Sequence, residues 1–306
     1  MNFYMRGYKQ KVMNFHNLHI FTVVAEKMNI TEAARALYIT QPAVSKAIKS
    51  LESQLNLRLF WRDKRNGLML SETGKEILIL ARQLIMIEEK IRQIANRENS
   101  LVDCNVKVGA LPSMSSYLMP SAMSRLKSRY DSLRIQLAEG SSNEIKTWVE
   151  ERAVEIGIVL APFDSFDCQL LYEDDMVAVL PQTHPLVSSE KIDLMKHQEE
   201  LIFCRSGYEG TLSNLLADRY KEITSHLIVQ SAETLVNMVQ HGLGIGIISR
   251  ISQSTLRHNL IVKPIFPAIC QQIGIIVHSF EELTPAAMAV HEILAGLGAD
   301  YGSKHG

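Results

Sequence analysis

The stretch TEAARALYITQPAVSKAIKSLESQL, residues Thr31–Leu55, decides how the first part of the chain folds. A short helix over Glu32–Leu37 contains two alanines that allow close approach of a neighbouring helix, and Thr31 is its expected N-cap. After a break at 38–40, Pro42 occupies a position that is favoured at the start of a helix. The pattern therefore predicts two consecutive helices joined by a tight turn.

The second of these helices runs to about Leu55 and is amphipathic. Its apolar residues form one stripe, Val44, Ala47, Ile48, Leu51 and Leu55. In a helix-turn-helix the second helix is held by such a stripe while its outer face enters the major groove of DNA. Short polar and long basic side chains read base edges and bind phosphates. The outer face of this helix carries Ser45, Lys46, Lys49 and Ser53, with Gln41 and Pro42 at its N-terminus, and the family resemblance described below narrows the expected DNA contacts to Gln41, Pro42, Ser45, Lys46 and Lys49.

The flanking segments complete a winged helix-turn-helix. A first helix is expected over Asn17–Lys27, and the apolar segments Leu59–Trp61 and Leu68–Leu70 enclose an Asn-Gly pair, which is a strong hairpin signal. Three basic residues near the hairpin tip suit a wing against the DNA backbone, namely Arg62, Lys64 and Arg65. The alternative is a packed three-helix unit with a merely solvated basic face.

A long helix is expected from Glu72 to about residue 96, with Ser71 as its cap. Its apolar positions alternate in steps of three and four, the spacing of a coiled-coil seam. We interpret these residues as a dimerisation surface: Ile77, Leu80, Leu84, Ile87, Ile91 and Ile94. A dimer would hold two recognition helices at a fixed separation. Because the seam is shorter than three heptads, packing of this helix on its own domain is the alternative.

The charge of the chain is divided between its two parts. The 306 residues carry a net charge of −1, but residues 1–100 hold 16 basic and 9 acidic groups, while residues 101–306 hold 16 and 24. The basic excess lies within residues 1–66, which have 11 basic and 4 acidic groups. A compact basic module of this size is typical of a protein that binds a phosphate backbone.

Composition excludes several other classes of protein. With 46% hydrophobic and 21% charged residues the chain is an ordinary globular protein of two or three domains. Four cysteines, Cys104, Cys168, Cys204 and Cys270, lack metal or redox spacing, so we expect no metal, no cofactor and four buried thiols in a reducing compartment. Neither a membrane span nor a secretory signal is present, which predicts a cytoplasmic protein.

Beyond residue 101, strands alternate with helices, which predicts parallel sheets covered by helices. The expected strands are Val106–Leu111, Leu133–Glu139, Glu155–Leu160, Met176–Pro181, Leu201–Cys204, His226–Gln230, Ile245–Ser249 and Ile273–His278. Crossovers near 161–163 and 263–267 would divide this part into two lobes.

The expected organisation is a multidomain chain. A disordered extension is expected over 1–13, with Met13 as an alternative start, followed by the winged helix-turn-helix 14–71, a linker helix and hinge 72–100, and a two-lobed α/β domain 101–306. Lobe I takes about 104–161 and 268–300, and lobe II about 162–267.

Residues 17–74 closely resemble the winged helix-turn-helix of LysR-type transcriptional regulators. The resemblance is carried by QPAVSKAIKSLE at Gln41–Glu52, LNLRLFWR at Leu55–Arg62 and LSETG at Leu70–Gly74, and more diffusely by HGLGIGIIS at His241–Ser249. It implies a bacterial, cytoplasmic regulator that binds promoter DNA as a dimer of dimers, a homotetramer. It also implies a periplasmic-binding-protein type II-like effector domain and contact with RNA polymerase.

The same resemblance indicates where a small-molecule effector would bind. Loops at the carboxyl ends of strands resemble the effector-contacting segments of the family, and ligands of open α/β sheets sit at such ends. The candidates are Ser113, Ser115, Arg205, Thr211 and Thr234, which could bind a small anion such as a carboxylate. The alternative is that these residues only cap helices, and that Arg205 is a surface ion-pair partner.

The main competing class is a helix-turn-helix protein fused to an α/β enzyme domain. The glycines at 242, 244 and 246 precede an expected strand instead of following one, so the dinucleotide fingerprint fails. No H-E-x-x-H or G-x-S-x-G motif occurs, and we expect no catalytic residues.

Overall fold

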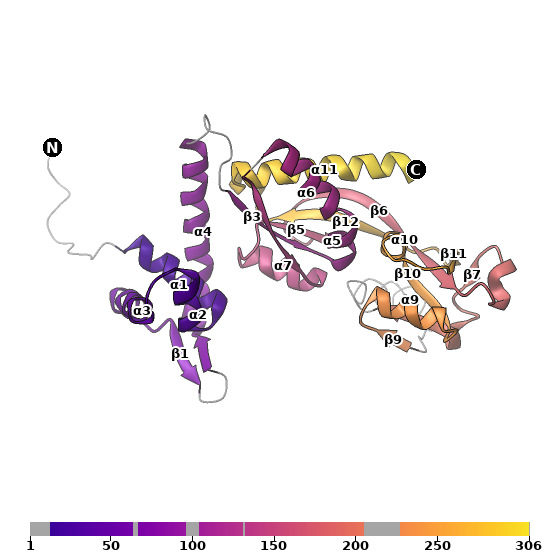
Figure 1. Ribbon diagram of the computed structural model, residues 1–306, viewed down its shortest axis with the longest axis horizontal. Coiled ribbons are helices and arrows are strands. Elements are labelled where there is room, and N and C mark those ends of the chain that lie inside the picture. Colours follow the sequence, from indigo (N-terminus) through magenta and orange to yellow (C-terminus); the bar gives the residue numbers. More distant parts are fainter. Residues whose placement is uncertain (1–12, 64–66, 96–103, 131, 205–226, 306) are drawn as a thin grey trace. The chain divides into compact units, whose positions relative to one another are not determined.

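The computed structural model describes residues 13–63, 67–95, 104–130, 132–204 and 227–305, with side chains up to residue 299. The chain divides into two compact units, 1–91 and 92–306, and each is described by itself (Figure 1). Residues 1–12 of the expected extension, the wing tip at 64–66 and the hinge at 96–103 lie outside the described residues.

The first unit has the expected order of three helices, a hairpin and a long helix. Its elements are α1 (Phe15–Lys27), α2 (Ile30–Ala36), α3 (Gln41–Leu55), β1 (Phe60–Asp63), β2 (Gly67–Leu70) and α4 (Glu72–Ala95), which extends past the unit boundary. The core is formed where α1, α3 and β1 meet, and the rings of Phe21 and Phe60 make an edge contact at 5.5 Å there. The hairpin pairs β1 and β2 antiparallel.

Helix caps fix where these elements begin. The expectation that Thr31 caps α2 is wrong: the Asn29 side chain accepts from the backbone N–H groups of Thr31 and Glu32, at 2.8 and 3.2 Å. Asn29 has the extended backbone of an N-cap, so α2 begins earlier than its apolar residues indicate. Ser71 caps α4 as expected, since its Oγ accepts from Gly74 N at 2.9 Å.

The second unit is a two-lobed α/β structure. It contains, in chain order, β3 (Asn105–Ala110), α5 (Pro112–Tyr117), α6 (Met119–Arg129), β4 (Arg134–Glu139), α7 (Ser142–Glu150), β5 (Ile156–Leu160), β6 (Asp167–Leu180), η2 (Pro185–Ser188), β7 (Ile192–Asp193), η3 (Gln198–Glu200), β8 (Leu201–Cys204), β9 (Leu227–Val229), α9 (Ala232–Gln240), β10 (Ile245–Ser249), α10 (Arg250–Ser254), β11 (Ile261–Phe266), β12 (Cys270–Val277), η4 (Phe280–Glu282) and α11 (Pro285–His305). Paired strands run in the order β4-β3-β5-β12-β6-β10-β8-β9, with β11 beside β6 and β7 beside β11.

The lobes are joined by a strand that belongs to both. The first part of β6, Asp167–Asp175, pairs with β12, and the second part, Met176–Leu180, pairs with β10 and β11. The chain therefore changes sheets between Asp175 and Met176, whereas the sequence places this crossover near 161–163. Residues 263–266, expected to lie in the second crossover, belong to β11. The hydropathy pattern predicts only the apolar end of β6, as the strand Met176–Pro181. The first part of β6 is not predicted as a strand because it carries charged residues on its exposed face.

The sheet is mixed rather than parallel. β3, β4 and β5 pair in parallel, as do β8, β9 and β10, but β6 and β12 run antiparallel to their neighbours. In the first lobe α6 and α11 lie on one face of the sheet and α7 on the other (Figure 1). The lobe is therefore a three-layer structure that buries most of β3 and all of β5, whereas β4 stays exposed or half-buried.

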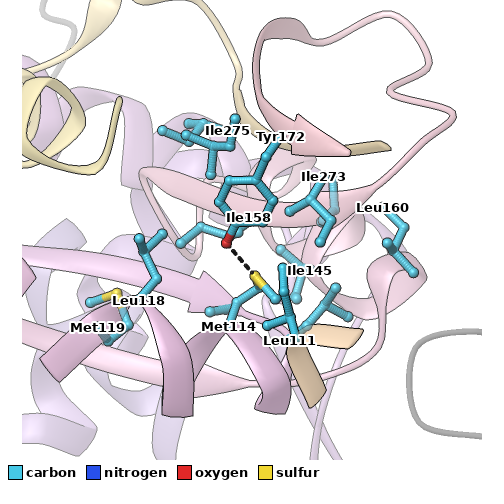
Figure 2. Close-up of a cluster of buried hydrophobic side chains, with 14 of the residues drawn as sticks. Leu111, Met114, Leu118, Met119, Ile145, Ile158, Leu160, Tyr172, Ile273 and Ile275 are labelled. Carbon is cyan, nitrogen blue, oxygen red and sulfur yellow. Dashed lines mark hydrogen bonds between the residues drawn. The ribbon is translucent and has the colours of Figure 1, made fainter. Parts of the chain in front are cut away.

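The core of the first lobe reaches from the sheet to α5. Figure 2 shows Met114 of α5 pointing toward Tyr172 of β6, whose hydroxyl donates to the methionine sulfur at 2.9 Å. The expectation of four buried thiols is wrong for Cys168 and Cys270, which are exposed. Both occupy solvent-facing positions of the strands β6 and β12. Cys104 is buried and Cys204 half-buried.

Candidate nucleic-acid interface and lobe junction

Helix α3 packs one face on the core of the first unit and carries its predicted DNA-binding residues on the opposite face. The stripe Val44, Ala47, Ile48 and Leu51 is buried in the core of the first unit, as predicted. The Thr40 hydroxyl caps the helix by accepting from Ala43 N at 3.4 Å. The predicted DNA-binding residues lie on the outer side of the helix. Gln41, Pro42, Lys46 and Lys49 are exposed there, and Ser45 is half-buried.

The recognition helix is also fixed to the hairpin. Glu52 Oε1 accepts from Leu59 N at 2.8 Å and from Phe60 N at 3.3 Å. These hydrogen bonds tie the acidic side chain of α3 to the backbone at the start of the hairpin. Arg62 lies opposite Leu68 in the hairpin and is exposed. Lys64 and Arg65 lie outside the described residues. The geometry thus orients α3 and the described part of the wing as one body.

Helix α4 leaves an apolar face exposed. Leu78 and Ala81 are buried in the core of the first unit, with Ile77 half-buried beside them. Five of the six residues of the predicted seam are exposed, up to 59% for Leu80 and 64% for Ile91: Leu80, Leu84, Ile87, Ile91 and Ile94. The helix therefore uses a different face for its own domain, and Ile77 is the member of the predicted seam that joins the core.

The junction of the two lobes contains buried polar groups that lack partners. Asp174 of β6 is 1% exposed; its Oδ1 accepts from Ile251 N of α10 at 3.2 Å, while its Oδ2 has no hydrogen-bond partner. Gln271 of β12 pairs with Asp174 across the strands, is 2% exposed, and has no partner for either side-chain amide atom. Because directly opposed residues share a face of the sheet, these groups lie side by side.

Burial raises the pKa of Asp174 from 3.8 to about 6. The nearby Ser249 hydroxyl, the N–H of Ile251 and the charge of Arg250 lower the pKa of Asp174, and the charge of the neighbouring Asp175 adds to the rise. The pKa of Tyr117 in α5 is raised by burial and by the charge of Asp174, so α5 also faces this group. Asp174 is therefore an acidic residue of β6 that lies close to α5 and α10 at the point where the two lobes join.

The predicted effector residues are partly brought to this region. Ser113 and Ser115 lie on α5, and the buried Ser115 Oγ has no partner. Thr234 is exposed in the first turn of α9, where its N–H donates to the Ser231 hydroxyl at 3.2 Å, so a capping role accounts for this pair. Arg205 and Thr211 lie outside the described residues.

Asp174 and Gln271 were not predictable from the sequence as members of this site. Asp174 is the middle of three consecutive acidic residues, Glu173–Asp175, a run that is usually solvent-exposed, and its spatial neighbour Gln271 is remote in the chain. Only strand pairing brings the two together. No group of His, Cys, Asp or Glu in the described residues could hold a metal ion, and no helix of that part is long and apolar enough to cross a membrane.

A winged helix-turn-helix followed by a two-lobed α/β unit is an architecture typical of DNA-binding regulators, and comparison with known proteins gives the class. Two family models match: the bacterial regulatory helix-turn-helix protein, lysR family, over residues 15–75, and the LysR substrate binding domain over 104–298. The chain belongs to the LysR family and is a DNA-binding transcriptional regulator, not an enzyme.

Individual relatives agree with this assignment. The HTH-type transcriptional regulator YoaU of Bacillus subtilis (strain 168) is 53% identical over 284 residues, 92% of this chain and 98% of that protein. The fold is similar to a full-length variant of OxyR from Pseudomonas aeruginosa, with a TM-score of 0.74, 22% identity and coverage of 93% and 97%. It is also similar to full-length CbnR complexed with its target DNA, with a TM-score of 0.62, 15% identity and coverage of 92% and 99%.

Proposed function

We propose that this regulator reads promoter DNA with the outer face of α3, while the hairpin β1–β2 contacts the backbone beside it. The observation that carries the proposal is the anchoring of α3: one face is buried, and the other presents basic and short polar groups to solvent. The contacting residues would be Gln41, Pro42, Ser45, Lys46 and Lys49 in the groove, with Arg62, Lys64 and Arg65 at the wing.

The exposed apolar face of α4 supports self-association. An apolar stripe on a single helix is stabilised when a second copy covers it, and a two-fold pair would place two α3 helices on successive turns of DNA. We propose a dimer through α4 that assembles into a dimer of dimers on the promoter. RNA polymerase would be the partner through which transcription changes.

The second unit would sense a small metabolite between its lobes. Buried polar atoms without partners at Ser115, Asp174 and Gln271 support this location, because such groups carry a desolvation cost that a ligand or water can relieve. The proposal of an anionic effector rests on Arg205. Binding of the metabolite between the lobes would change their relative orientation, and this change would alter the arrangement of the DNA-bound assembly.

The DNA-binding proposal is tested by gel shift of the full chain with promoter fragments at graded salt. Each phosphate-binding lysine contributes a salt slope of about one, so Lys46→Ala and Lys49→Ala should weaken binding and flatten the slope. Lys196→Ala in the second unit also changes an exposed lysine and should leave binding unaltered. Binding without salt dependence, or unaltered binding by both α3 variants, would refute the assignment of this surface.

The effector proposal is tested by a thermal-shift screen of small carboxylates on the full chain, since a ligand of the native state raises the unfolding temperature. Arg205→Ala should abolish the shift and leave DNA binding intact. A shift that persists in this variant would show that Arg205 does not bind the effector.

A further inference from the structure

The turn between α2 and α3 carries an unusually exposed aromatic side chain. Tyr38 is 96% exposed, the highest value among the large hydrophobic side chains that the structure leaves exposed in its described part. Its neighbours Leu37 and Ile39 are half-buried against the core of the first unit. The tyrosine therefore gains almost nothing from burial although the residues on both sides are anchored.

The backbone at this position is costly for a tyrosine. Its φ is 55°, in the left-handed region that glycine adopts without steric penalty and other residues avoid. The conformation is fixed by hydrogen bonds from Tyr38 N to Arg35 O at 3.2 Å and from Ile39 N to Ala34 O at 3.0 Å. The fold requires the turn but does not require this side chain, and glycine would suit the turn better.

We infer that Tyr38 is a DNA-contacting residue that packs its ring on the sugar–phosphate backbone at the edge of the groove entered by α3. The inference rests on the proposed use of α3. Tyr38 precedes Gln41, the first residue of that helix, by three positions, so their Cα atoms are no more than about 11 Å apart. The major groove is about 12 Å wide, which places the turn at its wall when the start of α3 is inside.

The chemistry of the surroundings favours a nucleic acid as the occupant. Arg35, in the last turn of α2, and Lys46 on α3 are exposed basic residues of the two helices that the turn joins. A tyrosine hydroxyl donates to a phosphate oxygen, and its ring packs against deoxyribose carbons. The contact would be insensitive to sequence and would fix the position of α3 along the groove.

The test measures stability and DNA binding of the full chain together. The glycine variant Tyr38→Gly should hold or raise the unfolding temperature, because glycine tolerates the left-handed backbone. The same variant should weaken binding to a fluorescein-labelled promoter duplex by about threefold to tenfold, the loss expected for one hydrogen bond and its ring contact. Tyr38→Phe keeps the ring and loses the hydroxyl, so its affinity should lie between those of Tyr38→Gly and the unaltered chain.

Asn56 provides the matched control. It is an exposed residue with φ of 53° at the other end of α3, about 21 Å along the helix, and Asn56→Gly should leave affinity unchanged. Unchanged binding by Tyr38→Gly would overturn the inference. Lys46→Ala, assayed in parallel, separates the two failures: if it weakens binding and Tyr38→Gly does not, only the role of Tyr38 is wrong. If neither variant weakens binding, the proposed use of α3 fails as well.

Discussion

Replacing Asp174 by asparagine should make the second unit more stable at neutral pH and less sensitive to pH. The pKa of this carboxyl is raised from 3.8 to about 6 by burial, so between these values the folded state binds more protons than the unfolded state. Stability is then lost as pH rises through about 6. A pKa difference of this size corresponds to about 3 kcal/mol of unfolding free energy, and Asp174→Asn removes this loss of stability.

The asparagine can keep the local structure. Its side-chain oxygen can still accept from Ile251 N, the bond that Asp174 makes at 3.2 Å. At pH 4 the aspartate is largely neutral, so the variant and the unaltered chain should unfold at similar urea concentrations. At pH 7.5 the variant should be more stable by up to about 3 kcal/mol.

Urea unfolding followed by tryptophan fluorescence measures the effect. Trp61 and Trp148 are the two tryptophans of the chain, and a Trp61→Phe background leaves Trp148 of α7 as a reporter of the second unit. Asp175→Asn is the matched control: this neighbour is exposed, and its substitution should change stability by no more than about 0.5 kcal/mol. If Asp174→Asn is less stable than the unaltered chain at pH 7.5, the carboxylate is favourably held and the reasoning is wrong.

Two further predictions concern packing. Gly246→Ala should cost about 1–3 kcal/mol in the same unfolding assay, because its Cβ would crowd Leu235 and would lie 2.8 Å from a methyl group of Val179. Gly296→Ala has open space in α11 and should not destabilise; equal effects of the two alanines would contradict the packing argument. On α4, Leu84→Glu should dissociate the proposed dimer in analytical ultracentrifugation; an unchanged mass would exclude this seam.

Local periodicity made much of the first unit predictable. The buried stripe of α3, the hairpin of β1 and β2 and the cap at Ser71 depend on residues within a few positions of one another, and sequence patterns contain that information. The error at Thr31 has the same origin, because Asn29 competes for the cap two residues earlier. Backbone geometry, not residue type alone, selects between such neighbours.

The second unit shows the limit of that approach. Its alternation of strands and helices and its two-lobed plan follow from the sequence, but the passage of β6 through both lobes does not. The pairing of Asp174 with Gln271 depends on β12 returning beside β6, nearly one hundred residues later. The sequence alone determined which face of α3 is apolar and which carries basic and polar side chains, because that property is local. Tertiary structure decided which polar groups are buried without partners, because burial depends on what the rest of the chain places around them.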